Sequence, residues 1–511
     1  MTLDFSRNLH FVWALLPEII LCVSGMGVLL AGVSGRRDGR TPEGERYAEE
    51  SPSDDLGWLS LVGIGLAALA NGWLYGVTEV GNHSMVAVDG FRLFGNWIFL
   101  AAAAFGVVMS ITYVWRQRLQ AGEYYALILF ATAGMMFMAG ARDLMVVFLG
   151  LEVMSISVYA LTAFNRRDRR SAEAGLKYFL LGAFSTGFFL YGIALVYGAT
   201  GSTNISAIGL AVQSGAATPG LLIIGIALLA VGFAFKVSAV PFHMWTPDVY
   251  EGAPTPITAF MSVAVKAAAF VAFFRVFLVA FGGVYESWYA LMWWLAAITM
   301  VVANLIALAQ TNVKRMLAYS SVAHAGYLLV ALTAANEQAT AGMLFYLLVY
   351  AVMNMGAFGV VLAVGRQAED NLQLDDYAGL GARQPLLGVI LTVFLLSLAG
   401  FPGTGGFMGK IFLLQGAAAA QLWTLSVVLV LTTVVSYYYY LRLAWYTWMR
   451  DPRSPDQHEG VFVPLSMRLA LAAGVAAVLF LGIFPGGFME AARSSAEGLT
   501  GVGTLILGMT P

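Results

Sequence analysis

Five ionisable side chains stand in stretches that are otherwise apolar. They are Glu152 in VVFLGLEVMSISVYAL, Lys177 in AGLKYFLLGAF, Lys236 in AVGFAFKVSAVPFHMW, Lys266 in MSVAVKAAAF and Lys410 in GGFMGKIFLLQG. Charged side chains are costly in apolar surroundings and usually mark a pathway for ions or protons. A lysine in low dielectric also loses affinity for its proton, because desolvation disfavours the charged form. These residue types therefore indicate proton transfer.

A structural interpretation competes at these positions. Glu152 and Lys236 can form a buried ion pair that only fixes helix register. Lys177 lies close to the start of its apolar stretch and can extend its ammonium group to the headgroup boundary. His243 and His324 titrate in the range that suits a proton relay, but each can equally be a histidine that is satisfied by hydrogen bonds.

Other polar residues near apolar stretches are expected to be structural. Helix packing or an interfacial position is expected for Glu18, and helix capping and turn shaping for Asp248 and Glu251. Tyr437 to Tyr440, with Arg442 after them, are expected to pack against other helices and to anchor their helix at the interface.

No motif predicts a metal, nucleotide or redox centre in this chain. The sequence has no HExxH motif and one cysteine, Cys22, which cannot form a disulfide framework or a four-cysteine iron–sulfur site. The segment GTGGFMG lies in an apolar run and is not followed by the Lys-Ser/Thr pair of a phosphate-binding loop. We therefore expect transport or coupling rather than chemistry performed by this chain.

The composition predicts a polytopic α-helical membrane protein. Of 511 residues, 59% are hydrophobic and 11% are charged, and the mean hydropathy is +0.78. A soluble domain has about 25% charged residues. The formal net charge of -2 gives no reason to expect a nucleic-acid partner. The N-terminus lacks a basic region followed by a small-residue cleavage site, so no removable signal peptide is expected.

Apolar runs long enough to cross a bilayer, about 20 residues each, predict fourteen membrane spans. They lie near residues 10–33, 57–77, 93–115, 124–141, 143–164, 176–198, 220–243, 257–281, 289–309, 316–334, 341–365, 386–415, 422–446 and 466–488. The polar insertion 34–56 is expected to be a flexible surface loop, and the tail after 488 an interfacial end.

Basic residues alternate between the loops and predict the orientation. They occur in the first, third, fifth, ninth, eleventh and thirteenth loops, whereas the sixth, eighth, tenth and twelfth have none; the basic residues are Arg36, Arg37, Arg40, Arg46, Arg116, Arg118, Arg166, Arg167, Arg169, Arg170, Lys314, Arg315, Arg366, Arg383, Arg450 and Arg453. The odd-numbered loops are therefore expected to face the cytoplasm, with both termini on the outer side. Arg92 and Arg142 are the exceptions.

Two of the predicted spans are interrupted. The seventh breaks at Pro241, and the twelfth breaks at AGFPGTGGFMGK, which contains Pro402. Because the breaks are five spans apart, they predict two inverted five-helix repeats. The expected division is 1–123 for helices 1–3, 124–281 for the first repeat, 289–446 for the second repeat, and 447–511 for the last helix and tail. We also expect free carbonyl groups just before Pro241 to stabilise the charged form of Lys236.

Three stretches resemble a known family. FKVSAVPFHMWTPDVYEGAPTPITAFMSVAVKAAAF (235–270), NVKRMLAYSSVAHAGYLL (312–329) and LSLAGFPGTGGFMGKIFLL (396–414) are similar to signature segments of the antiporter-like membrane subunits of respiratory complex I. The resemblance covers about residues 11–490. Residues 149–192 resemble subunit N most closely. Subunit L would carry a long lateral helix at its C-terminus, and subunit M typically has a glutamate where this chain has Lys410.

The resemblance implies an all-helical fold of fourteen helices with two inverted repeats, and a role for each buried ionisable residue. Glu152 would modulate Lys236, the lysine of the broken seventh span. Lys266 would be the central connecting lysine and Lys410 the terminal residue towards the outer exit, while Lys177 corresponds to a lysine of span 6. One departure is Asn312, where an aspartate is expected in many relatives.

The implied function is proton translocation in an NADH:quinone oxidoreductase of a bacterial inner membrane. Partner subunits of the L, M, K, J, A and H types would be expected, with NADH, FMN, iron–sulfur clusters and quinone bound outside this chain. Alternatives left open are a subunit of an Mrp-type cation/proton antiporter, a subunit of a membrane-bound hydrogenase or of the photosynthetic relative of complex I, and a scaffold whose charges only fix packing.

Overall fold

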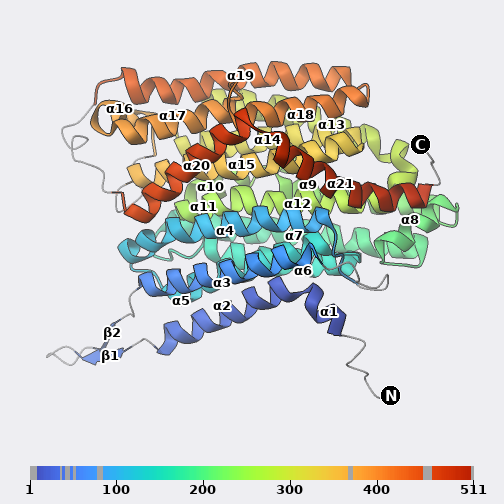
Figure 1. Ribbon diagram of the computed structural model, residues 1–511, viewed down its shortest axis with the longest axis horizontal. Coiled ribbons are helices and arrows are strands. Elements are labelled where there is room, and N and C mark those ends of the chain that lie inside the picture. Colours follow the sequence, from blue (N-terminus) through green and yellow to red (C-terminus); the bar gives the residue numbers. More distant parts are fainter. Residues whose placement is uncertain are drawn as a thin grey trace.

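The chain forms a bundle of long helices that lie side by side (Figure 1). The computed structural model describes residues 9–34, 37–40, 46–49, 53–76, 85–365, 372–452 and 463–507. Within these ranges, thirteen helices are long and apolar enough to cross a membrane, and each coincides with a predicted span. The one remaining predicted span, the twelfth (386–415), is divided between two shorter helices. The predicted all-helical membrane fold is confirmed.

The N-terminal helices lie along one edge of the bundle. They are α1 (Leu9–Ala14), α2 (Leu16–Ser34) and α3 (Ser53–Leu74), and the next helix, α4 (Gly90–Gln117), lies further inside, with 67% of its apolar window buried. Between α2 and α3, strands β1 (Arg37–Arg40) and β2 (Arg46–Glu49) pair antiparallel. The insertion 34–56 therefore contains a small hairpin where a loop was expected, and its residues 35–36, 41–45 and 50–52 lie outside the described residues, as do the basic residues Arg366 and Arg453.

The middle and C-terminal parts repeat one order of helices: three long helices, a broken pair and a closing helix. The three long helices of the first set are α5 (Ala121–Gly140), α6 (Leu144–Thr162) and α7 (Arg169–Thr200). After the short helix α8 (Ile205–Gln213) comes the broken pair, α9 (Pro219–Val237) and α10 (Thr246–Gly252). The closing helix is made of α11 (Thr255–Phe260), the π-helical turn η2 (Met261–Val265), α12 (Lys266–Arg275) and a second π-helical turn, η3 (Val276–Ala280). The second set begins with the short turn η4 (Gly282–Val284), and its three long helices are α13 (Tyr285–Ala309), α14 (Val313–Ala334) and α15 (Glu337–Val364). After η5 (Leu374–Tyr377) and α16 (Leu380–Arg383) comes the broken pair, α17 (Pro385–Ala399) and α18 (Gly405–Ala419). The closing helix is α19 (Trp423–Met449).

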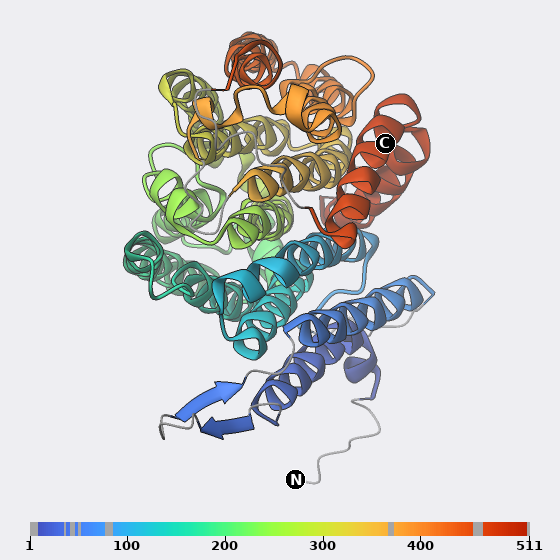
Figure 2. The same ribbon diagram turned by 90° about the vertical axis from the view of Figure 1, so that its left-hand side faces the viewer.

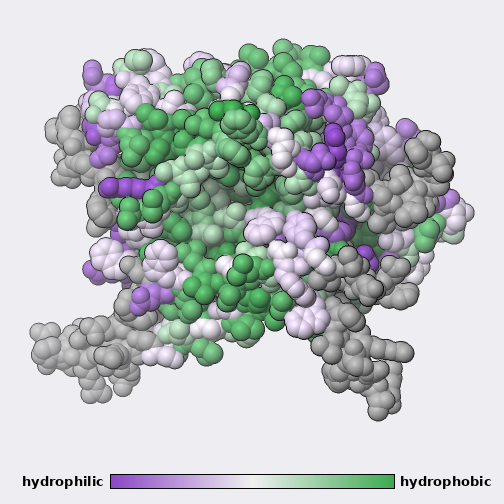
Figure 3. All heavy atoms as spheres, viewed as in Figure 1, coloured by the Kyte–Doolittle hydropathy of each residue, from purple (hydrophilic) through white to green (hydrophobic). Residues whose placement is uncertain are grey.

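The chain closes with α20 (Leu465–Ile483) and α21 (Gly486–Leu507). The tail after 488, expected as an interfacial end, is part of α21, which packs against α4 and α15. Seen from the end of the bundle in Figure 2, the N-terminal helices and the second repeat lie at opposite edges. Apolar residues gather over the middle of the face drawn in Figure 3, and hydrophilic residues lie towards its two ends, as membrane insertion requires.

Burial differs sharply among the spans, and this difference locates the interior. The apolar window of α14 is wholly buried and that of the span Thr255–Ala280 is 94% buried, whereas those of α7 and α19 are 33% buried. Helices α12 and α14 therefore form the centre of the bundle, where polar side chains have no access to bulk water or lipid. These two helices carry Lys266 and His324.

Both broken pairs end their first helix in a left-handed residue. Helix α9 ends at Val237, and its C-cap Ser238 has φ of 64°; α17 ends at Ala399, followed by Gly400 with φ of 88°. The break in α9 thus begins three residues before the predicted Pro241. A left-handed residue ends a helix because its backbone can no longer continue the ladder of hydrogen bonds.

Candidate functional site

The three lysines predicted in the seventh, eighth and twelfth spans lie beside the breaks in their helices. Lys236 is in the last turn of α9, Lys266 follows the π-helical turn η2, and Lys410 is in α18 beyond the second break. Their exposed fractions are 2%, 3% and 4%, so their ammonium groups do not reach the surface. Among the residues that the structure describes, none of the three forms an ion pair with a carboxylate.

Lys236 is bound by two hydroxyl groups of α6. Its Nζ donates to Ser155 Oγ at 2.7 Å and to Tyr159 Oη at 2.9 Å, and it lies 5.0 Å from the centre of the Tyr159 ring. The tyrosine fits because α7 has a glycine opposite: a Cβ at Gly182 would overlap with Tyr159 Oη. Both partners are hydroxyl groups, which can donate as well as accept hydrogen bonds.

Glu152 lies on the same face of α6 as Ser155, one turn earlier, but it does not contact Lys236. Its carboxylate accepts a hydrogen bond from Thr186 Oγ1 of α7 at 2.9 Å. The structure therefore does not bring Glu152 and Lys236 together as an ion pair, and Ser155, one turn from Glu152 on α6, accepts a hydrogen bond from Lys236. Residues three apart on a helix are neighbours, so a rotamer change of Glu152 acts directly on the surroundings of Ser155 and Lys236.

Two carbonyl groups in the last turn of α9 already have hydrogen-bond partners, and Lys236 Nζ donates to hydroxyl groups and not to a carbonyl. The carbonyl of Phe235 accepts from Trp245 Nε1 at 3.1 Å, and that of Ala234 accepts from the backbone of the next turn. At the second break, by contrast, Lys410 Nζ takes this position. It donates to the carbonyls of Leu398 at 3.2 Å and Ala399 at 2.8 Å, at the negative end of the α17 dipole.

One face of α14 links Lys266 to Lys410. Lys266 Nζ donates to Ser321 Oγ. One turn further, the His324 ring lies with its centre 5.4 Å from that of Tyr327, and the Tyr327 ring lies 5.1 Å from Lys410 Nζ. Positions 321, 324 and 327 are three residues apart and so share a face of the helix. His324 therefore lies between Lys266 and Lys410 along this face of α14.

Two tyrosines from other helices complete the surroundings of His324. Its Nδ1 forms a hydrogen bond with Tyr346 Oη of α15 at 2.5 Å, and its Nε2 forms one with Tyr440 Oη of α19 at 3.1 Å. Tyr440 also forms a hydrogen bond with Ser320. Tyr440, which the sequence suggested only packs or anchors the helix, is thus part of a buried polar chain.

Aromatic rings lie between Lys236 and Lys266. The Tyr178 ring stacks on Trp245 with centres 4.3 Å apart, and the Trp245 and Tyr250 rings are 6.1 Å apart. Lys236 Nζ is 5.7 Å from the Tyr178 ring, and Lys266 Nζ is 5.8 Å from the Tyr250 ring. Rings therefore lie between the first two lysines, whereas α14 supplies hydrogen-bonding groups beyond Lys266.

His243 lies in the break between α9 and α10 and is half-buried. The centre of its ring is 6.4 Å from that of Tyr319 on α14. The structure thus places His243 at the edge of the line of buried lysines, which is formed by Lys236, Lys266 and Lys410, and does not insert it between two of them.

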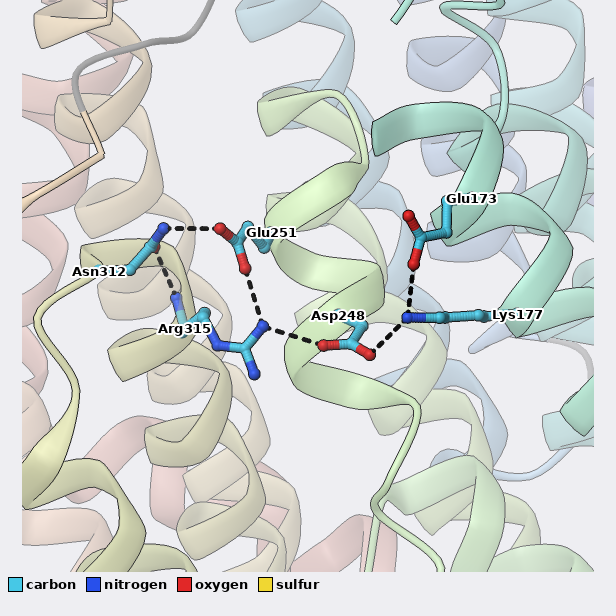
Figure 4. Close-up of polar contacts among 6 residues, drawn as sticks. All are labelled: Glu173, Lys177, Asp248, Glu251, Asn312 and Arg315. Carbon is cyan, nitrogen blue, oxygen red and sulfur yellow. Dashed lines mark hydrogen bonds and ion pairs between the residues drawn. The ribbon is translucent and has the colours of Figure 1, made fainter. Parts of the chain in front are cut away.

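Lys177 lies outside the buried line of lysines. Its side chain is 42% exposed, and its Nζ contacts Glu173 at 2.7 Å and Asp248 at 2.9 Å (Figure 4). A hollow of about 220 Å³ opens beside these groups. Lys177 therefore joins α7 to α10 at the surface, where ion pairs are screened by solvent.

The same ion network continues from α10 to α14. Arg315 contacts Asp248 at 2.9 Å and Glu251 at 2.8 Å, and Asn312 Nδ2 donates to Glu251 at 2.9 Å (Figure 4). Asp248 and Glu251 thus connect three helices, beyond the capping role expected for them. Asn312 caps α14 through its carbonyl oxygen, and its amide can donate to Glu251, which an ionised aspartate at this position could not do.

A second pair of ion pairs ties the first helices to the bundle. Glu18 is fully buried and pairs with Arg92, which also donates to the carbonyl of Ala87 at 2.7 Å. Glu18 thus contributes to helix packing and does not lie at the interface, which was the other position expected for it, and its partner is Arg92, one of the two exceptions among the loop charges. Asp89 caps α4 and is bound by Arg275 at 2.7 and 2.8 Å. Burial raises the pKa of the Asp89 carboxyl, but the charge and hydrogen bonds of Arg275 outweigh it and leave that pKa below its usual range.

Sequence reasoning missed the neutral partners of the lysines. Ser155, Tyr159, Ser321 and Tyr346 have the residue types of ordinary helix packing. One signal was available for the first two, because positions 152, 155 and 159 follow the helical spacing i, i+3 and i+7 from Glu152. In the described part of the chain, no three His, Cys, Asp or Glu side chains gather as a metal site.

The chain is similar to known membrane proteins over most of its length. The family model described as "NADH:quinone oxidoreductase/Mrp antiporter, TM" matches residues 141–436. NADH-quinone oxidoreductase subunit N of Trichlorobacter lovleyi is 47% identical over 487 residues, which is 94% of this chain and 96% of the relative.

Two solved structures have the same fold. A chain of respiratory complex I from Thermus thermophilus with bound Aureothin is 35% identical, with a TM-score of 0.79 and coverage of 94% of this chain and 99% of that chain. A chain of the Mrp complex from Dietzia sp. has a TM-score of 0.82 and covers 98% of this chain and 99% of that chain, but at 20% identity it shows the fold alone. The sequence matches, which extend over nearly the whole chain, establish that it belongs to the NADH:quinone oxidoreductase/Mrp antiporter family of membrane proteins.

Proposed function

We propose that this chain is the N-type, proton-translocating membrane subunit of an NADH:quinone oxidoreductase. The observation that carries the proposal is the line of three buried lysines, Lys236, Lys266 and Lys410, which are bound only by neutral groups in the described structure. Because no fixed carboxylate holds their charge, each can gain or lose a proton when its surroundings change. The subunit N relatives at 43–47% identity support the same function.

The proposed sequence of events begins at Glu152. Redox chemistry in other subunits would move this carboxylate towards or away from Ser155 and Lys236. The attraction between opposite charges falls with distance and is strong in low dielectric, so the movement changes the proton affinity of Lys236. The proton then passes to Lys266, along the α14 face through His324, and to Lys410. Lys177 and His243 are proposed to act at the edge of this route.

An Mrp-type cation/proton antiporter subunit and a hydrogenase subunit are less well supported. The Mrp chain shares the fold at 20% identity, whereas relatives named subunit N match at 43–47% over most of the chain. Dependence of transport on sodium in vesicles without any NADH dehydrogenase would instead favour the antiporter.

We further propose the setting in which the chain works. Its partners would be the L, M, K, J, A and H types of membrane subunit, and NADH, FMN, iron–sulfur clusters and quinone would be bound by other subunits. The membrane would be the bacterial inner membrane, with the odd-numbered loops in the cytoplasm and both termini on the outer side. The alternation of basic loops supports this orientation.

The proposal is tested by measuring protons pumped per electron in vesicles that contain the intact complex. Lys236→Ala should lower this ratio while NADH oxidation by the peripheral redox centres persists with an artificial acceptor. Glu337→Gln, at an exposed carboxylate in the first turn of α15, is the control and should pump at close to the wild-type ratio. A wild-type ratio for Lys236→Ala would refute the proposal.

A further inference from the structure

A basic hollow of about 530 Å³ lies outside the line of buried lysines. It is formed by the end of α4, the connection from α6 to α7, and the end of α10. Four of its lining residues are arginines and one is an acid: Arg116, Arg118, Arg167, Arg170 and Asp168. The acid accepts a hydrogen bond from Arg170, whereas Arg116, Arg118 and Arg167 form no ion pair with the residues that the structure describes. The hollow therefore carries an uncompensated positive charge.

A narrow apolar crevice adjoins this hollow. The two share Tyr113, Arg116 and Gln117 of α4 as lining residues. From there the crevice is lined mainly by apolar side chains of α4, α15 and α20, among them Met109 and Leu362. Because α4, α15 and α20 are membrane spans, the crevice leads from the charged end of the bundle into its apolar zone.

We propose that this combined surface binds an anionic phospholipid. Guanidinium groups bind phosphate oxygens through paired hydrogen bonds, and basic pockets between membrane helices suit anionic headgroups. The crevice would receive part of an acyl chain. A free phosphate ion would use the arginines but not the crevice, and an acidic segment of a partner protein would not need an apolar continuation of the site. The third and fifth loops meet here, so the site lies at the end of the bundle where the basic loops gather.

The test uses the intact complex, stripped of lipid and titrated with a photoactivatable phosphatidylglycerol in phosphatidylcholine vesicles. Labelled peptides are identified by mass spectrometry. In the wild type, label should appear on the crevice segments of α4 and α15. Arg116→Gln with Arg167→Gln should weaken this labelling by about 30-fold, because each basic residue near an anionic lipid contributes roughly 1 kcal/mol.

A matched control is available in the same loop. Arg166 and Arg169 are exposed but do not line the hollow, so Arg166→Gln with Arg169→Gln removes the same charge and should leave the labelling unchanged. Leu362→Trp fills the crevice and keeps all the arginines, and it should also abolish the labelling. This variant tests the proposal if Arg116→Gln with Arg167→Gln fails to assemble.

Three results would overturn the proposal. The first is equal labelling of the crevice in both double variants. The second is displacement of the label by inorganic phosphate as effectively as by unlabelled phosphatidylglycerol, which would indicate a site for free anions. The third is a zero-length cross-link from Asp168 to a partner subunit in the wild type, which would show that a protein covers the hollow.

Discussion

Replacing Lys410 separates its role in proton transfer from its role in packing. In the structure its Nζ donates to the carbonyls of Leu398 and Ala399 and lies over the Tyr327 ring. Lys410→Met keeps the length of the side chain but cannot hold a proton. Lys410→Arg keeps a cation and its donors but does not release its proton in proteins. If Lys410 must gain and lose a proton, both variants block translocation through this chain.

The contacts set the expected cost in stability. Lys410→Met leaves two buried carbonyls without this donor, at roughly 1–3 kcal/mol each. The variant also removes the cost of burying an ammonium group without a counter-ion, which is several kcal/mol for a charged group in a protein. Because these changes oppose each other, we expect the stability of the complex to change by no more than about 2 kcal/mol, so assembly is retained.

The assay compares NADH-driven acidification of vesicles with NADH oxidation, in the presence and absence of an uncoupler. Both Lys410 variants should lower the number of protons pumped per electron. Gln415→Met, a change of an exposed polar residue on the same helix, is the control and should pump normally. If Lys410→Arg pumped at the wild-type ratio while Lys410→Met did not, a fixed charge would suffice and the reasoning from proton exchange would be refuted.

Three further predictions follow from single contacts. Gly400→Ala forces a side chain into a residue with φ of 88°, where its Cβ would lie 3.0 Å from the Cδ atom of the neighbouring lysine in α18; we expect a loss of roughly 1–2 kcal/mol in stability and reduced pumping, and unchanged thermal unfolding would contradict this. Tyr159→Phe keeps the ring but removes the hydroxyl that accepts from Lys236, an interaction of about 1.5–3 kcal/mol for a charged donor; pumping per electron should fall while assembly measured on native gels is retained, and a wild-type ratio would count against a role for this hydroxyl. Asp89 has a pKa below its usual range beside Arg275. Its carboxylate should therefore contribute its full stability above the unfolded-state pKa of about 3.9, and this contribution should be lost as the pH falls through the lower folded-state pKa. The thermal unfolding temperature should fall more steeply with acid in the wild type than in Asp89→Asn, and parallel curves would refute the assignment.

The sequence by itself determined where the membrane spans are and where two of them break. Bilayer thickness requires apolar runs of about 20 residues, and proline and glycine interrupt helices by backbone geometry, which is local. Local composition also distinguished Lys236, Lys266 and Lys410, because a charge in an apolar run is visible without knowledge of the fold. For the same reason the repeated order of helices could be predicted from the positions of the breaks.

Only the tertiary structure decided what each ionisable group touches. Lys236 binds a serine and a tyrosine that are 81 and 77 residues away in sequence, and His324 meets a tyrosine 116 residues away. Ser155, Tyr159 and Tyr440 resemble ordinary packing residues in the sequence, because hydroxyl side chains in a helix have no local sign of their distant partners. Carbonyl groups at a helix break bind Lys410 but not Lys236, since the direction of a side chain at a helix break depends on the helices packed around it. Proton affinity depends on those neighbours, so the chemistry of the site is fixed by packing.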